Sequence, residues 1–178
     1  MIKRIKELRP DVDIASPKFR DFIEKFESEI NRGISTLSIL SIISRYGKEG
    51  IYGYRILKEL EVETNKMLII EEGTLYPLLR NLERDNVINS RKQETGRKRK
   101  YYFMTHNGKK IYNYLTGYYS KLTKALSNLV DFSVELKNNY IYCPMCANKM
   151  DITSLDYNYC GVCGYNLERE IKEKRLNK

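Results

Sequence analysis

Residues 73–104 read GTLYPLLRNLERDNVINSRKQETGRKRKYYFM and join a short amphipathic helix to a strongly basic hairpin. Leucines recur in the helix at i, i+3, i+4 and i+7, which on a 3.6-residue turn forms one apolar stripe for burial. These leucines are Leu75, Leu78, Leu79 and Leu82. Thr74 is the expected N-cap, which makes Pro77 the third helical residue, where its missing N–H is one of the orphan donors anyway. The pattern predicts a helix that buries one side and leaves a polar side free.

The hairpin carries much of the positive charge of the chain. Between residues 88 and 104 there are six basic residues against one acidic residue, a net of +5 out of the formal +9 of the whole chain. Thr95 and Gly96 mark the turn, and residues 101–104 alternate as a half-buried strand does. A solvated charge run on an ordinary hairpin is the alternative. The helix in front favours a winged helix-turn-helix that binds double-stranded DNA.

The polar face of the helix and the tip of the hairpin supply the expected DNA contacts. At 100° per residue, Pro77, Arg80 and Arg84 project away from the leucine stripe, with Thr74 and Tyr76 on its flanks. Basic side chains at the hairpin tip can reach a phosphate backbone or a minor groove. The residues expected to contact DNA are Thr74, Tyr76, Pro77, Arg80, Arg84, Arg97, Lys98, Arg99 and Lys100.

Several short strings in this part of the chain resemble the PadR family of transcriptional regulators. They are RGISTL (32–37), YGY (52–54) followed by Ile56, EGTLYPLL (72–79), Leu82-Glu83, and RKRKYYF (97–103) leading into Thr105 and Gly108. The match covers roughly residues 32–108, and EGTLYPLL is its most specific part. The resemblance implies a homodimeric winged-helix repressor that binds an operator near a promoter. It also implies that residues 73–85 are the DNA-reading helix and residues 97–100 the wing.

Residues 1–31 form an extension ahead of the winged helix-turn-helix domain, which we assign to residues 32–104. Ser16 and Pro17 suit an N-cap and a first helical position. The apolar residues that follow recur at helical spacing and predict an extra docking helix that packs through an aromatic stripe. They are Phe19, Phe22, Ile23, Phe26 and Ile30. Residues 34–46 and 52–63 predict the first two helices of the domain, and residues 64–71 the turn into the reading helix.

A long helix is predicted after the wing, from residue 105 to about residue 137, within a segment 105–139. Its apolar residues repeat every 3.5 positions, which is typical of a coiled-coil seam and predicts a homodimer. The seam residues are Ile111, Leu115, Tyr118, Leu122, Ala125, Leu129, Phe132 and Leu136. A two-fold dimer would present two reading helices to successive major grooves about 34 Å apart, which predicts a palindromic operator.

All four cysteines follow that helix, as Cys143-Pro144-Met145-Cys146 and Cys160-Gly161-Val162-Cys163. Two C-x-x-C pairs at this spacing predict a zinc ribbon over residues 140–167, in which four thiolates close one structural Zn²⁺ site per chain. Iron in a rubredoxin-like site and two redox-active disulfides remain as alternatives. His106, the single histidine, is expected as an exposed turn residue rather than a ligand. Residues 168–178 are expected to be a charged tail.

The residues of the ribbon indicate its function less clearly than they indicate its fold and metal site. Residues 140–167 carry Lys149 against Asp151 and Asp156, so the ribbon has no basic face of its own. This favours a structural role or a protein contact, such as one to RNA polymerase, over a grip on DNA. The order winged helix, long helix and zinc ribbon also resembles the archaeal general transcription factor related to the alpha subunit of factor IIE, which implies a monomeric cofactor of RNA polymerase. A zinc-sensing or redox-sensing regulator is a third hypothesis.

Taken together, these patterns predict a mainly α (α+β) chain with an N-terminal helix, a winged helix-turn-helix, a long coiled-coil dimerisation helix and a small zinc ribbon. At 178 residues there is room for one main domain and a small satellite. No enzyme is expected, because the sequence has neither a nucleophile with a visible base nor a Gly-rich phosphate loop. No run of eighteen apolar residues exists, and the start MIKRIKELRPDVD lacks the apolar region of a signal peptide. We therefore expect a cytoplasmic protein with no membrane attachment.

Overall fold

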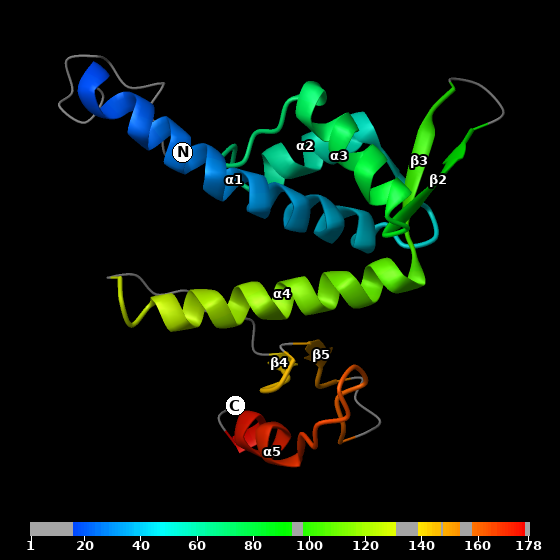
Figure 1. Cartoon of the computed structure of the whole chain (residues 1–178). Helices are drawn as coiled ribbons and strands as arrows, with labels where there is room; N and C mark the ends of the chain where they lie inside the picture. Colours follow the sequence, from blue (N-terminus) through cyan, green and yellow to red (C-terminus); the bar gives the residue numbers. More distant parts are fainter. Residues whose placement is uncertain (1–15, 94–97, 131–138, 147, 154–157, 177–178) are drawn as a thin grey trace. The chain divides into compact units, whose positions relative to one another are not determined.

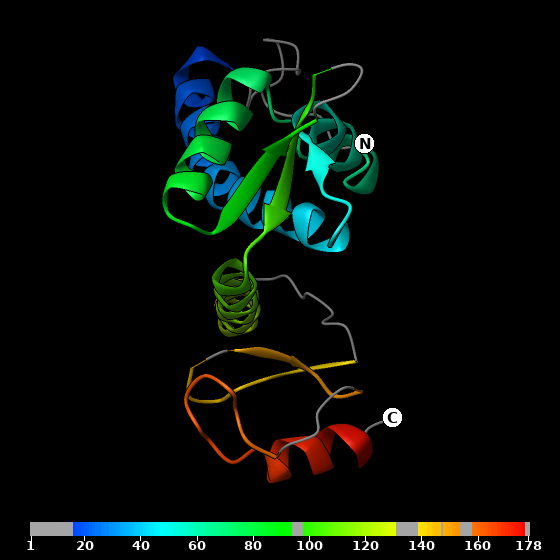
Figure 2. The ribbon, with the colours of Figure 1, turned by 90° about the vertical axis from the view of Figure 1, so that its right-hand side faces the viewer.

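The computed structural model describes residues 16–93, 98–130, 139–146, 148–153 and 158–176. The chain divides into two compact units, residues 1–108 and residues 109–178, and each is described by itself. Figures 1 and 2 trace helices α1 to α5 and strands β1 to β5 along the chain. The predominance of helix with two small sheets confirms the predicted fold class. No helix within the described ranges is both long and apolar enough to span a membrane.

The first unit is a three-helix domain with a small antiparallel sheet. Its helices are α1 (Pro17–Arg45), α2 (Gly53–Glu63) and α3 (Glu72–Arg84), and its strands are β1 (Ile51–Tyr52), β2 (Ile88–Lys92) and β3 (Lys100–Met104). The strand order is β1-β3-β2, so that Tyr102 of β3 pairs with Ile51 on one side and Ser90 on the other. Strand β1 has two residues, which are too few to give a periodic pattern, so it was not predicted from the sequence.

An aliphatic core joins the three helices to the sheet. Its side chains come from every helix of the unit and from β1 and β2, and each is at most 2% exposed. They are Ile39, Leu40, Ile42, Ile43, Ile51, Ile56, Leu60, Leu75, Leu79 and Ile88. The leucine stripe predicted for α3 is therefore buried at Leu75 and Leu79, and also at Leu82 with 9% exposure, while Leu78 is half-buried at the edge.

Helix α1 is one continuous helix of 29 residues, where the sequence predicted a docking helix and a separate first helix. Gly33 does not break it, because a glycine inside a helix costs only about 1 kcal/mol relative to alanine. The predicted aromatic stripe lies along the first half of α1 and is uncovered in the described chain: Phe22 is 73% exposed and Phe26 is 56% exposed. Within the part of the chain that the structure describes, the core therefore does not bury this stripe.

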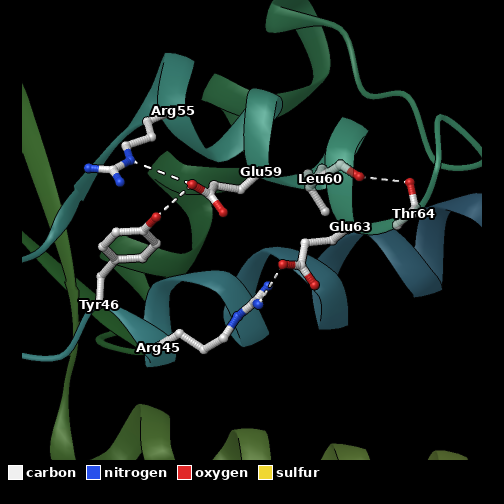
Figure 3. Close-up of polar contacts among 7 residues, drawn as sticks. All are labelled: Arg45, Tyr46, Arg55, Glu59, Leu60, Glu63 and Thr64. Atoms are coloured by element: carbon white, nitrogen blue, oxygen red, sulfur yellow. Dashed lines mark hydrogen bonds and ion pairs between the residues drawn. The ribbon is translucent and has the colours of Figure 1, made fainter.

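Polar contacts fasten the C-terminal end of α1 to α2 (Figure 3). The Tyr46 hydroxyl donates to Glu59 at 2.6 Å, and Arg45 forms an ion pair with Glu63 at 3.0 Å. At the end of α2 the Thr64 hydroxyl donates to the Leu60 carbonyl oxygen at 2.7 Å. These contacts fix the angle between α1 and α2 and the turn that leads into α3.

Helix α3 begins earlier than the sequence predicted. Its N-cap is Glu71 and its first residue is Glu72, so Thr74 is not the cap and Pro77 lies inside the helix. The predicted cap was wrong because proline is usual in the first turn of a helix, which placed the start at Thr74. In the structure the helix starts at Glu72, and Pro77 is tolerated in its second turn. Its ring occupies the exposed side of α3, and the missing N–H leaves the Gly73 carbonyl oxygen without its usual helical partner.

Helix α4 (His106–Leu126) begins directly after β3 and continues into the second unit. Its predicted end was about residue 137, but residues 127–129 form a turn, consistent with the poor helix propensity of Ser127 and Asn128. Leu129 lies beyond the helix and is 82% exposed. Phe132 and Leu136 of the predicted seam lie outside the described residues, and Ala125 is the last seam residue within α4.

The rest of the second unit is built around the four cysteines. It contains the two-stranded antiparallel sheet of β4 (Tyr140–Tyr142) and β5 (Lys149–Asp151), and helix α5 (Glu168–Leu176). The segment predicted as a charged tail is therefore a helix. Its Ile171 is 6% exposed and packs in the core of the ribbon with Ile141 and Leu167. Ile171 and Leu176 are the apolar residues of α5, and two such residues five positions apart give no periodic signal, although the small core needs Ile171.

Candidate nucleic-acid interface and metal centre

A hollow of about 540 Å³ lies where the start of α2, the middle of α3 and the returning strand of the hairpin meet. Tyrosine rings and basic side chains line it together, a combination suited to phosphate oxygens and the sugars beside them. The lining residues are Tyr52, Gly53, Tyr54, Tyr76, Lys98, Arg99, Lys100 and Tyr102. The structure thus brings together Tyr76 and the three described basic residues of the predicted wing.

Close packing at Gly53 fixes the position of the Tyr76 ring. A Cβ atom built on Gly53 would lie 2.7 Å from Tyr76 Cε1, so α2 and α3 approach this closely because residue 53 is glycine. On the other side of the hollow the Arg99 guanidinium lies 4.4 Å above the centre of the Tyr52 ring, which itself packs edge-on against Tyr101. The cation–π contact holds Arg99 in one direction before any ligand arrives.

Glu83 of α3 ties the wing to the reading helix. Its Oε2 accepts a hydrogen bond from Lys100 Nζ at 2.7 Å, and its Oε1 accepts one from the Ser90 hydroxyl. The bonds from Lys100 and Ser90 lower the pKa of Glu83 below its ordinary value and keep it ionised. The sequence marked Glu83 only as part of a family string and gave no sign of this pairing, because the pairing joins positions 17 residues apart.

The other predicted DNA contacts divide between two edges of α3. Arg80 and Lys98 are exposed, and neither forms an ion pair with a described residue. Arg84 is also exposed and pairs with its neighbour Asp85 at 3.1 Å. Arg97 lies outside the described residues.

Thr74 and Pro77 lie away from the wing. They border a second hollow, of about 660 Å³, formed between α3 and the first half of α1. Glu24, Glu27 and Glu71 contribute carboxylates to this hollow and Arg32 contributes one positive charge, so its lining has a net negative charge. Negative charge repels a phosphate backbone, so the Tyr76 edge of α3 is the better candidate for DNA and the Thr74 edge the weaker one.

The four cysteine sulfurs form a second candidate site. All four Sγ atoms lie within 4.8 Å of one another, with 3.4 Å between Cys143 and Cys163 and 3.5 Å between Cys146 and Cys160. Four sulfurs around a tetrahedral Zn²⁺ with bonds of about 2.3 Å would be about 3.8 Å apart. The donor set and its spacing fit one metal ion with no open coordination position.

Each C-x-x-C pair forms a backbone turn that directs its sulfurs inward. In the first turn the Cys143 N–H donates to the Asn148 carbonyl oxygen at 2.9 Å, and in the second the Cys160 N–H donates to the Tyr165 carbonyl oxygen at 2.8 Å. Gly164 follows the second turn at φ +73°, a conformation that glycine adopts readily. The buried Asn148 side chain joins the two turns, because its Nδ2 lies 3.9 Å from Cys160 Sγ.

The thiols ionise unequally at such short distances. Burial and, to a smaller extent, hydrogen bonds with the neighbouring thiols raise the pKa of Cys146 to about 12. At Cys160 burial opposes ionisation, but backbone N–H groups of Cys163 and Val162 and nearby thiols donate to the sulfur and lower its pKa to about 7. A cluster of this kind ionises fully when a divalent cation balances the thiolates, which agrees with the metal-binding geometry.

Comparisons with known proteins place the first unit in a family. The model described as the transcriptional regulator PadR-like family matches residues 39–113. A protein of Lysinibacillus sphaericus, described as uncharacterized, is 34% identical over 113 residues, and the match covers 61% of this chain and 94% of that protein.

Two solved structures agree with this match. A transcriptional regulator from Clostridium thermocellum is 30% identical with a TM-score of 0.53 and covers 57% of this chain and 98% of its own. A PadR family transcriptional regulator from Eggerthella lenta is 27% identical with a TM-score of 0.55, and the match covers 65% of this chain and 98% of that protein. The family match ends before the cysteines, which begin at Cys143. The chain therefore belongs to the PadR-like family of transcriptional regulators and carries a four-cysteine module beyond the family domain.

Proposed function

We propose that this chain is a transcriptional regulator, a repressor, that binds a palindromic double-stranded DNA operator as a homodimer. The observation that carries the proposal is the hollow of tyrosines and basic residues between α2, α3 and the wing. Half or more of the hydrogen bonds in protein–DNA complexes go to phosphates and sugars, and such contacts fix the register of a reading helix. A regulator of this kind acts where the DNA is, which in a cell without a nucleus is the cytoplasm.

We assign different roles to the residues of this surface. Arg80, exposed beside Tyr76 on the side of α3 that the core leaves free, is the candidate for base contact in the major groove. Lys98 and Arg99 contact phosphates, Arg99 from the direction set by Tyr52. Lys100 is committed to Glu83 and positions the wing. Arg84 adds positive charge at the margin of this surface, and Arg97, which lies outside the described residues, is kept as a wing residue by its place in the sequence. Thr74 and Pro77 would meet DNA only at the acidic edge of α3.

The uncovered faces of α1 and α4 support a dimer. On α4 the seam residues Ile111, Tyr118 and Leu122 are 39%, 53% and 42% exposed. The aromatic stripe of α1 is also uncovered within the described chain. Apolar faces of this extent on two helices are typical of an interface between copies, and a two-fold arrangement gives the palindromic operator. Because α4 ends at Leu126, the interface relies on a helix of 21 residues rather than an extended coiled coil.

We infer that the four cysteines hold one structural Zn²⁺. Four thiolates in two turns leave no coordination position for a substrate, and the ribbon core is too small to fold without such a support. The position of this module beyond the family match supports a second candidate function, a contact to RNA polymerase or another protein of the transcription machinery.

Binding to selected DNA tests the proposal. A preferred site is first enriched from random duplexes, and the affinities of wild type and variants for it are measured by fluorescence anisotropy at several salt concentrations. We expect Arg80→Ala to weaken specific binding by about 1–3 kcal/mol and to relax the preference at one base pair. Lys98→Ala should weaken binding to all duplexes alike and reduce the salt slope by about one unit.

Lys172→Ala, an exposed lysine of α5, serves as the matched control and should leave affinity unchanged. The mass of the protein–DNA complex decides between an operator-binding dimer and a monomeric general transcription factor. Two chains on one palindrome support the operator-binding dimer. One chain per duplex with no sequence preference contradicts it and favours the general-factor reading. Equal affinities of wild type, Arg80→Ala and Lys98→Ala for the selected site contradict the assigned surface.

A further inference from the structure

Helix α4 contacts the backbone of the first cysteine turn. Lys121 Nζ donates a hydrogen bond to the Pro144 carbonyl oxygen at 2.6 Å. Pro144 lies between Cys143 and Cys146, inside the turn whose sulfurs face the metal site. The direction of its carbonyl group therefore depends on the conformation that the two cysteines impose on this turn.

A second lysine makes a contact between the same two parts of the unit. Lys149, three residues after Cys146, has its ammonium group 4.7 Å from the ring centre of Tyr140 on β4 and 4.8 Å from that of Tyr112 on α4. Its charge is thus shared between one ring of the ribbon and one ring of the helix. Lys149 is half-buried, which strengthens its cation–π contacts relative to exposed ones, whereas the hydrogen bond of Lys121 is exposed.

Electrostatics favours these contacts when the metal is bound. A divalent ion held by four thiolates carries a net charge of −2, so positive groups around it stabilise the loaded centre. Helix α4 contains four lysines and no acidic residue: Lys109, Lys110, Lys121 and Lys124. The loaded centre and α4 are therefore complementary in charge, and Lys121 and Lys149 are the residues that bring this complementarity to the first turn.

We propose that Lys121 and Lys149 dock the metal-loaded ribbon onto α4, so that metal binding and the order of α4 are coupled. The inference rests on the zinc assignment made under the proposed function. Coupling between two equilibria is reciprocal: if the loaded centre orders α4, then contacts from α4 must tighten metal binding by the same factor. The uncovered seam of α4 lies on the same helix, so metal occupancy reaches the surface that a second copy would use.

The first test measures metal transfer from the full-length, zinc-loaded protein to an excess of a chromogenic chelator. Methionine keeps most of the length of a lysine side chain without its charge. Each of Lys121→Met and Lys149→Met should release zinc about threefold faster, and the double variant about tenfold faster, because each contact is a partly exposed charged one. Lys110→Met is the matched control, an exposed lysine of α4 with no contact to the ribbon among the described residues, and should release zinc at the wild-type rate.

The second test measures hydrogen exchange of the α4 amides, residues 111–126, with and without bound zinc. In the wild type, zinc should slow their exchange. In the double variant, zinc should protect the ribbon amides but leave those of α4 unchanged. Equal zinc release rates in the wild type, the two single variants and the double variant would overturn the docking. Exchange of the α4 amides that zinc does not alter in the wild type would overturn it too.

The same data separate this inference from the zinc assignment. A wild-type chain that takes up no stoichiometric zinc refutes both. A chain that binds one zinc with equal release rates and an unresponsive α4 refutes the docking and leaves the structural zinc intact. DNA affinity plays no part in either readout, so the operator proposal stands or falls separately.

Discussion

Ten aliphatic side chains with at most 2% exposure fill the core of the winged-helix unit, whereas six buried residues form the core of the ribbon, and two of these are Cys143 and Cys160. A core of the first kind stabilises a fold through burial of apolar surface. The second buries too little apolar surface to offset the conformational entropy of its chain without further support. We infer that the chain is stabilised in two ways, by apolar packing in its family domain and by the proposed zinc ion bound to four thiolates in the added module.

The largest expected effect is the loss of the ribbon when one cysteine is replaced. Cys160→Ser removes a buried ligand, and the apparent free energy of a structural zinc site, about 10–16 kcal/mol in small zinc-binding peptides, is folding free energy. We expect the amides of the ribbon to lose their exchange protection and zinc to fall from one per chain to none. The winged-helix amides should keep theirs.

Met145→Ser is the matched control for this variant. Met145 lies in the first cysteine turn and is 72% exposed, so its replacement leaves the four sulfurs in place. It should retain one zinc per chain. A ribbon that stays ordered without its fourth thiolate would mean that its apolar core is sufficient, and the contrast between the two units would fail.

The converse change is Leu79→Ala in the winged-helix unit. Leu79 is fully buried on α3, and truncation of such a side chain costs about 2–5 kcal/mol through lost burial and the remaining cavity. Thermal unfolding of the helical signal should shift to lower temperature, while zinc content and ribbon protection stay unchanged. Leu78→Ala, at a half-buried position of the same helix, should cost clearly less. Equal costs at the two positions would contradict the burial pattern of α3.

The same contrast explains which parts of the structure could be predicted from the sequence. The leucine stripe of α3 and the two C-x-x-C pairs are local patterns with strong physical constraints, and both lie where they were expected. The N-cap of α3 and the end of α4 were misplaced, because competing local signals at helix ends differ by small free energies. The tie between Glu83 and Lys100 and the fit of Tyr76 against Gly53 depend on tertiary contacts, so no window of sequence contains them.

The junction between the two units gives the next prediction, at Gly108. A Cβ atom on Gly108 would lie 1.8 Å from the Val87 carbonyl oxygen, a backbone atom that cannot move aside like a side chain. The Gly108 N–H also donates a hydrogen bond to the Thr105 hydroxyl oxygen at 2.8 Å, which caps the start of α4. Gly108→Ala should therefore destabilise the winged-helix unit by about 1–3 kcal/mol through overpacking, measured by urea unfolding.

Gly53→Ala is the comparison for Gly108→Ala. Its added Cβ would meet the Tyr76 ring, which can shift, so its cost in stability should be smaller, although the displaced ring should weaken DNA binding. Neither variant should change the zinc content of the ribbon. If Gly108→Ala released zinc, the start of α4 would belong with the ribbon and the boundary between the units would have to move.

The smallest expected effect concerns charge, and it distinguishes a tertiary ion pair from a local one. Glu83→Gln removes the carboxylate that holds Lys100, and because the two side chains are 32% and 39% exposed, solvent screening limits the loss to about 0.5–1 kcal/mol at pH 7. The folded-state pKa of Glu83 is lowered from its ordinary value of 4.5, so its contribution is fully present above that value and is lost as the pH falls through the lower folded-state pKa. The difference in unfolding free energy between wild type and Glu83→Gln should therefore shrink as the pH is lowered below about 4.5.

Glu173→Gln in α5 breaks a local pair with Arg169 whose side chains are 60% and 84% exposed, and it should leave stability unchanged at every pH. Urea unfolding at pH 7 and at acidic pH measures both variants, and a pH-independent loss for Glu83→Gln would show that packing, rather than the charge on Glu83, holds the wing against α3.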